Sequence, residues 1–127
     1  MATVMVVDDT MVIRETVARL LKREGYQTIC VASGKEALAA LKSSDPDLML
    51  LDIMMPEMDG MECLAILRKE PKWRELPVII MSALSDEEHQ RTAEKLGARD
   101  FLVKARFSIN QILDRVREAV DKSGMGN

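Results

Sequence analysis

Five polar side chains that could act on a phosphate stand at the ends of short apolar runs: Asp8, Asp9, Asp52, Ser82 and Lys104. Each has an ordinary explanation when taken alone, because adjacent aspartates often cap a helix and a single aspartate often opens a turn. Three carboxylates held together, however, repel one another and raise one another's pKa unless a cation is present. If the fold gathers the aspartates, a cation site is therefore expected.

The residue types also indicate which cation and which ligand. Oxygen ligands without histidine or cysteine select a hard cation, and a few carboxylates with room for water and phosphate oxygens suit Mg²⁺ better than Ca²⁺. The ammonium of Lys104 offers a positive charge to a phosphate, the hydroxyl of Ser82 offers a donor, and backbone N–H groups in the loop after Asp52 could add others. These residues predict a magnesium-dependent phosphate site.

The elements that must position these residues alternate between strand and helix. Apolar runs rich in valine, leucine and isoleucine predict five strands, at residues 3–7, 27–31, 48–52, 77–82 and 99–103. A helix is expected after each strand, because apolar residues recur there at helical spacing. Ser33, Ser85 and Ser108 have the spacing of helix N-caps, and Gly25 and Gly97 stand where a helix ends.

Five apolar strands that alternate with helices predict an α/β fold with one parallel sheet, covered by helices on both sides. Right-handed crossovers leave few ways to wind such a sheet. The carboxyl ends of its strands meet at one edge, which is where such sheets bind their ligands. The five polar residues are expected to converge at that edge, since each of them ends or follows a strand.

Composition fits one folded domain and excludes several other classes. The chain has 127 residues, of which 47% are hydrophobic and 31% charged, and its net charge of -3 argues against direct binding of nucleic acid. Its apolar runs, such as residues 48–51, are far shorter than the roughly 20 residues of a membrane span. The N-terminus lacks the basic segment of a secretory signal, so we expect a cytoplasmic protein. Cys30 and Cys63 lack metal-site spacing and are expected to be free, mostly buried thiols.

Four segments around the polar residues form a recognisable set: VMVVDD at residues 4–9, LMLLDIMMPEMDG at 48–60, PVIIMSA at 77–83 and DFLVK at 100–104. Together they resemble the receiver domain of bacterial response regulators of the chemotaxis-regulator type, from Ala2 to about Val120. The resemblance implies a flavodoxin-like, doubly wound five-stranded parallel sheet in the order 2-1-3-4-5, with five helices. It also implies a receiver domain over residues 1–122, with a flexible tail or the start of a linker at residues 123–127.

The resemblance assigns roles to the residues of the predicted metal site. It implies that Asp52 is the phosphoacceptor, whose carboxylate attacks the phosphorus of a donor phosphohistidine. Asp9 and Asp52 would hold Mg²⁺ directly, together with the backbone carbonyl of Met54. Asp8 would act on the cation through water.

The resemblance further implies a phosphorylation switch. Lys104 would pair with the new phosphoryl oxygens, Ser82 would move towards them, and Phe101, an aromatic residue of the fifth strand, would move with it. A purely structural role for Phe101 in the core remains a competing interpretation. The donor would be a partner histidine kinase or histidine phosphotransfer protein, since His89, the single histidine, lies on an expected solvated helix face. The downstream protein target is unknown, and the chain would be a monomer or a weak dimer.

Two departures from the family pattern carry their own expectations. Ala105 follows Lys104 where receiver domains usually have proline, and a cis bond before alanine costs about 2.5 to 4 kcal/mol, so we predict a trans peptide and a rearranged loop. Met54 and Leu84 lie two residues after the acceptor and after the switch serine, where a side chain could orient an attacking water. Neither holds water by a strong hydrogen bond, so we expect a long-lived phosphorylated form.

Three alternatives remain open. The chain could be the receiver fragment of a longer transcription factor or hybrid kinase, because its small polar tail fits a linker and a natural end equally well. It could be a Mg²⁺-dependent phosphohydrolase of the haloacid dehalogenase type, but that class needs a second aspartate two residues after its nucleophile, where this chain has Met54. A pseudo-receiver, which would dock partners without phosphorylation, is disfavoured by the complete set of polar residues.

Overall fold

The computed structural model describes residues 2–83 and 87–122, and the expected tail at residues 123–127 lies outside them. Its elements follow in the predicted order: β1 (Thr3–Val7), α1 (Met11–Arg23), β2 (Gln27–Val31), α2 (Gly34–Leu41), β3 (Leu48–Asp52), α3 (Gly60–Lys69), β4 (Val78–Ser82), α4 (Glu87–Lys95), β5 (Asp100–Val103), the 3-10 turn η1 (Lys104–Arg106) and α5 (Ile109–Lys122). Each predicted strand is present, with ends that agree to within one residue.

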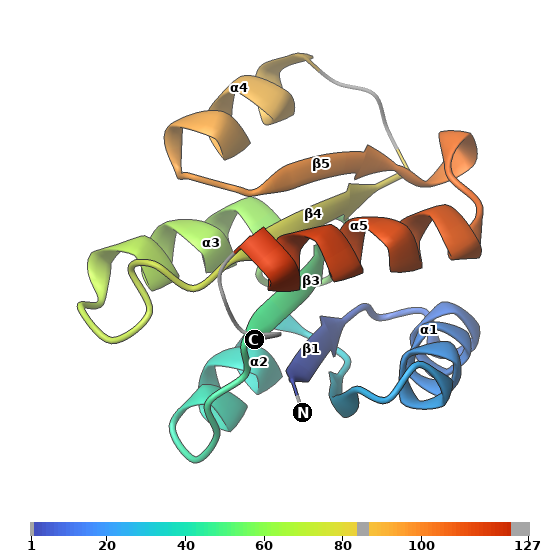
Figure 1. The fold of residues 1–127 in the computed structure, drawn as a ribbon. Coiled ribbons are helices and arrows are strands. Elements are labelled where there is room, and N and C mark those ends of the chain that lie inside the picture. Colours follow the sequence, from blue (N-terminus) through green and yellow to red (C-terminus); the bar gives the residue numbers. More distant parts are fainter. Residues whose placement is uncertain (1, 84–86, 123–127) are drawn as a thin grey trace.

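The five strands form one parallel sheet in the order β2-β1-β3-β4-β5. The predicted doubly wound α/β fold is therefore confirmed. In Figure 1, α1 and α5 lie on one side of the sheet, and α2, α3 and α4 lie on the other. Two apolar clusters correspond to these two layers. Because all strands run the same way, their carboxyl ends face a single edge of the sheet.

The inner strands are apolar because both of their faces are covered. Every residue of β3 and of β4 is buried. Successive side chains of a strand point to opposite faces, so Leu48 and Leu50 pack with α1 and α5, whereas Met49 and Leu51 pack with the other layer. This packing fixes the carboxyl ends of β3 and β4.

The ends of the helices follow the predicted pattern. Ser33 and Ser108 each accept a hydrogen bond from the N–H three residues further on, at 3.1 and 3.2 Å, which confirms both as N-caps. Gly25 and Gly97 follow α1 and α4 with φ values of 98° and 72°, a left-handed backbone that favours glycine. The cap predicted at Ser85 lies outside the described residues. None of the described helices is long and apolar enough to cross a membrane.

The expectation that both cysteines are mostly buried is wrong for one of them. Cys63 is buried in α3, but Cys30 is exposed. Cys30 lies on β2, at the edge of the sheet, and is not part of either apolar cluster that covers the sheet faces. A hydropathy pattern does not distinguish such a strand from a central one.

The connection between β5 and α5 differs from an ordinary loop. The peptide bond between Lys104 and Ala105 is trans, as predicted. Both residues belong to the 3-10 turn η1, and Phe107 returns to an extended backbone before α5 begins. Lys104 is therefore the first residue of this turn, immediately after the end of β5.

Candidate functional site

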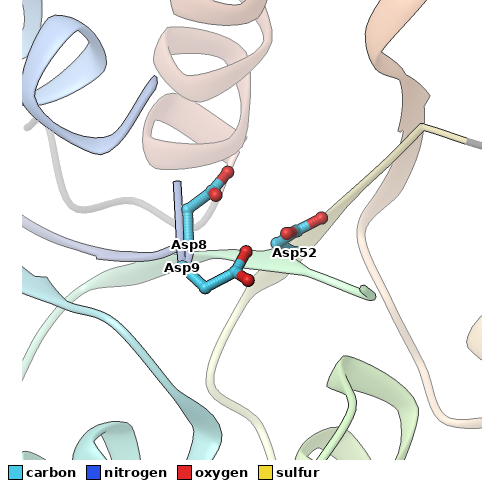
Figure 2. A group of neighbouring side chains, drawn as sticks. All are labelled: Asp8, Asp9 and Asp52. Atoms are coloured by element: carbon cyan, nitrogen blue, oxygen red, sulfur yellow. The ribbon is translucent and has the colours of Figure 1, made fainter. Parts of the chain in front are cut away.

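Three carboxylates meet at the carboxyl edge of the sheet, as the strand-end pattern predicts. Asp8 and Asp9 follow β1, and Asp52 ends β3, the neighbouring strand. The register pairs Val7 with Leu51, so Asp8 and Asp52 are the next residues along adjacent strands. One carboxylate oxygen from each aspartate lies within 4.8 Å of the others. Figure 2 shows the group, in which Asp8 and Asp52 are buried and Asp9 is exposed.

Lys104 joins the cluster from two strands away. Its ammonium donates a hydrogen bond to Asp8 Oδ2 at 3.0 Å and lies 3.2 Å from Asp52 Oδ1. Burial lowers the pKa of Lys104, but the hydrogen bond to Asp8 and the negative charge of Asp52 together raise it by more, so the pKa lies above its usual value. The side chain therefore remains a cation at the edge of the sheet.

The charge of the cluster is not balanced by Lys104 alone. Burial and the negative charge of Asp8 raise the pKa of Asp52 from 3.8 to about 6, against the attraction of Lys104. The ammonium is paired with Asp8 Oδ2 at 3.0 Å and with the buried Asp52 Oδ1 at 3.2 Å. Three carboxylates thus face one ammonium. A hard dication with oxygen ligands fits the remaining negative charge.

Asp8 is held by three further hydrogen bonds, two to its backbone and one to its carboxylate. Its N–H donates to the carbonyl of Val31 on β2 at 3.2 Å. Its Oδ1 accepts from the N–H of Thr10 at 2.8 Å, and its carbonyl accepts from Arg14 Nη1 at 2.7 Å. Arg14 is not among the predicted site residues. Its sequence signal is an arginine in the first turn of the helix after the aspartate pair, and arginine is common on such helices.

Gly60 determines how closely α3 approaches Asp52. Its N–H donates to the carbonyl of Ile53 at 2.9 Å. A Cβ atom at this position would lie 2.3 Å from the carbonyl oxygen of Asp52 and 2.9 Å from Ile53 Cα. Any larger residue would push against the backbone that carries the carboxylate. The sequence pattern does not reveal this role of Gly60, because a close approach of this kind depends on tertiary structure.

The remaining predicted residues occupy different positions around the site. Ser82 is 1% exposed at the end of β4, the strand that pairs with β3. Met54 follows Asp52 by two residues, and its side chain is largely exposed. Phe101 lies two residues before the end of β5, half-buried against the cluster under α2, α3 and α4. Leu84 lies outside the described residues.

A parallel sheet in this order, with carboxylates and a lysine at its carboxyl edge, defines a flavodoxin-like α/β domain with an acidic ligand site. The family model of the response regulator receiver domain matches residues 4–117. The chain therefore belongs to the response-regulator receiver family of two-component signalling, and the predicted resemblance is confirmed.

Individual relatives agree with this assignment. The "Probable transcriptional regulator ycf27" of Porphyridium aerugineum is 39% identical over 127 residues, in an alignment that covers 98% of this chain and 51% of the relative. The receiver domain of Francisella response regulator 1452 superposes with a TM-score of 0.88 at 34% identity, covering 97% of this chain and 99% of that one. The response regulator TrrA of Thermotoga maritima, in complex with Mg²⁺-BeF, has a TM-score of 0.82 at 31% identity, covering 94% and 99%. The chain spans about half, or less, of the length of the curated relatives it matches.

Proposed function

We propose that the chain is a phosphorylation switch in which Asp52 accepts the phosphoryl group. The observation that carries this proposal is the environment of the Asp52 carboxylate. It is buried at a strand end, it shares a cluster with two other carboxylates, and an ammonium lies 3.2 Å away. The ammonium faces Oδ1 of this carboxylate, and an ionised carboxylate oxygen in such a position can act as a nucleophile.

We infer that the cofactor is Mg²⁺. Asp9 and Asp52 would hold it directly, the backbone carbonyl of Met54 would be the third protein ligand, and Asp8 would act through water. The unbalanced negative charge of the cluster supports this inference, and so does the Mg²⁺-BeF complex of the related TrrA. When bound, Mg²⁺ supplies positive charge that stabilises the phosphoryl oxygens during transfer.

The residues of the chain would promote phosphoryl transfer through their positions and charges. An ionised oxygen of Asp52 attacks the phosphorus, the bond between phosphorus and the donor imidazole nitrogen breaks, and that nitrogen keeps the electron pair. Lys104 pairs with a phosphoryl oxygen, while its short distance to Asp8 keeps the ammonium at the site. The hydroxyl of Ser82 donates to a second oxygen. Such preorganised charges and donors are the main source of rate in phosphoryl transfer.

The output of the switch would be a change in protein binding. Phosphorylation adds about -1.5 to -2 charges and new acceptor oxygens, which favours the conformer with Ser82 drawn inward. Phe101 borders a hollow of about 280 Å³ between α4 and β5, and its ring would move in response. The donor would be a histidine kinase or histidine phosphotransfer protein. The chain would therefore act as a signalling domain and not as an enzyme.

Phosphorylation by acetyl phosphate tests the proposal. With Mg²⁺ the intact mass should increase by one phosphoryl group, and with EDTA it should not. Asp52→Asn should remove the labelling. Asp45→Asn, which changes a carboxylate whose side chain is 87% exposed, should leave it unchanged. Full labelling of Asp52→Asn would contradict the assignment of the acceptor. Equal labelling with and without Mg²⁺ would contradict the assignment of the cofactor.

A further inference from the structure

The connection between β3 and α3, residues 53–59, holds an unfavourable backbone conformation beside the proposed metal site. Glu57 has a φ of 67°, which a residue with a side chain adopts at a cost of about 1 kcal/mol or more. The N–H of Met58 donates to the carbonyl of Pro56 at 2.8 Å, which closes a tight turn with Glu57 at its centre. A conformation of this kind persists only when surrounding structure holds it.

The surrounding structure is the beginning of α2. A Cβ atom on Gly34 would lie 3.0 Å from Met58 Sδ and 3.2 Å from Met58 Cγ, so the methionine side chain occupies the space that only glycine leaves open. Beside this contact, Lys35 Nζ lies 3.3 Å from Glu57 Oε2. Both side chains of this ion pair are about 70% exposed, so solvent screens it and it adds little. Ile53 and Met55 anchor the first half of the connection in the core. The contact between Gly34 and Met58 is therefore the anchor of its second half, where Glu57 lies.

The segment that provides this anchor also touches the other half of the cluster. Val31, three residues before Gly34, accepts the N–H of Asp8 through its carbonyl. Ser33 caps α2 and thereby fixes the segment. Residues 31–34 thus contact the strand end that carries Asp8 and, through Met58, the connection that follows Asp52. A hollow of about 610 Å³ lies between these parts, and Asp9 is one of its lining residues.

We propose that Gly34 and Met58 are positioning residues for the metal site. Their contact holds residues 53–59 in the conformation that presents the Met54 carbonyl and the Asp52 carboxylate together, although neither residue touches the cation. The affinity for Mg²⁺ then depends on the packing of Met58 against Gly34 at the beginning of α2. This inference rests on the proposed metal site and adds a determinant that the acidic residues themselves do not contain.

Two measurements test the inference. The first is the dissociation constant for Mg²⁺, obtained by calorimetry on the full chain. Gly34→Ala adds a methyl group against Met58, and we expect it to raise this constant by about three- to tenfold, which is less than the roughly 10- to 100-fold typical of residues in direct contact with a ligand. In a Met58→Ala background, which lacks Cγ and Sδ, the same change should have an effect smaller than about twofold, because the two closest atoms are gone and only the carbonyl oxygen at 3.4 Å remains.

The second measurement is hydrogen exchange in the absence of divalent cations. The amides of Met58 and Gly60 should exchange faster in Gly34→Ala, since both are hydrogen-bonded within the connection. Gly25→Ala is the control, because it places a side chain at a φ of 98° with nothing nearby. It should lower the stability of the protein without changing the Mg²⁺ constant or these amides.

The outcomes separate the two levels of the proposal. Wild-type affinity and exchange in Gly34→Ala would overturn the inference, and so would an equal effect of Gly34→Ala with and without the Met58 side chain. Absence of Mg²⁺ binding by the wild-type chain would instead overturn the proposed metal site. In that case the exchange data still decide whether the contact holds the connection.

Discussion

Replacement of Asp52 by asparagine should stabilise the metal-free protein at neutral pH. Asparagine has nearly the same shape as aspartate but carries no charge, so Asp52→Asn removes one of three neighbouring carboxylates. Lys104 is not stranded by the change, because its hydrogen bond goes to Asp8. The buried carboxylate becomes a neutral amide, which is cheaper to bury.

The magnitude follows from the pKa of Asp52, which rises from 3.8 to about 6 on folding. A carboxyl group with a raised pKa binds its proton more tightly in the folded state, so the free energy of unfolding falls as pH rises from about 4 to about 6 and stays low above that. A shift of about two units corresponds to about 3 kcal/mol. At about pH 7.5 we therefore expect Asp52→Asn to be more stable than wild type by about 2 to 3 kcal/mol, and at about pH 4.5 by about 1 kcal/mol.

Urea unfolding followed by circular dichroism measures this difference, with EDTA present at both pH values. Addition of Mg²⁺ at the higher pH should stabilise wild type more than the variant, because the cation relieves the repulsion that the variant lacks. Asp45→Asn, at an exposed ion pair, should change stability by less than about 0.5 kcal/mol. If Asp52→Asn brings no gain at neutral pH, or the same gain at both pH values, the electrostatic account of the cluster is wrong.

Three further substitutions test other parts of the structure. Gly60→Ala should destabilise the chain by about 1 to 3 kcal/mol and weaken Mg²⁺ binding, because its Cβ would lie 2.3 Å from the carbonyl oxygen of Asp52. An unchanged midpoint of urea unfolding would contradict this close approach. Arg68→Ala should cost about 2 to 4 kcal/mol in thermal or urea unfolding, because its guanidinium donates to four backbone carbonyls, two in the loop between α3 and β4 and two just after α4. The exposed neighbour Lys69→Ala should be nearly neutral. Met54→Asn, alone or with Leu84→Glu, should shorten the lifetime of the phosphorylated form by about tenfold, because a polar side chain there can hold the attacking water. The lifetime is measured as loss of phosphate after the donor is removed. Decay at the wild-type rate would show that these two positions do not control the access of water.

The fold could be predicted from the sequence because each strand is a short apolar run, and because caps and glycines mark where several of the intervening helices begin or end. The site could be predicted because parallel strands place their carboxyl ends at one edge, which brings Asp52 beside Asp8 even though the two are far apart in sequence. Features that depend on tertiary distance could not be predicted. The exposure of Cys30 depends on which strand is at the edge, and the role of Gly60 depends on how closely α3 approaches β3. The hydrogen bond of Arg14 to the Asp8 carbonyl depends on where the first turn of α1 lies.

The ion pair between Asp8 and Lys104 joins residues that are 96 positions apart. During synthesis the ribosome therefore releases every carboxylate of the cluster long before it releases the ammonium. A growing chain carries the acceptor but lacks the charge that neutralises a phosphoryl group, until β5 adds the last strand to the sheet. Signalling competence should then arise in one step, when the sheet is complete. A nascent or truncated chain that ends before Lys104 would accept phosphoryl groups poorly. It would therefore not compete with the complete protein for the phosphoryl donor.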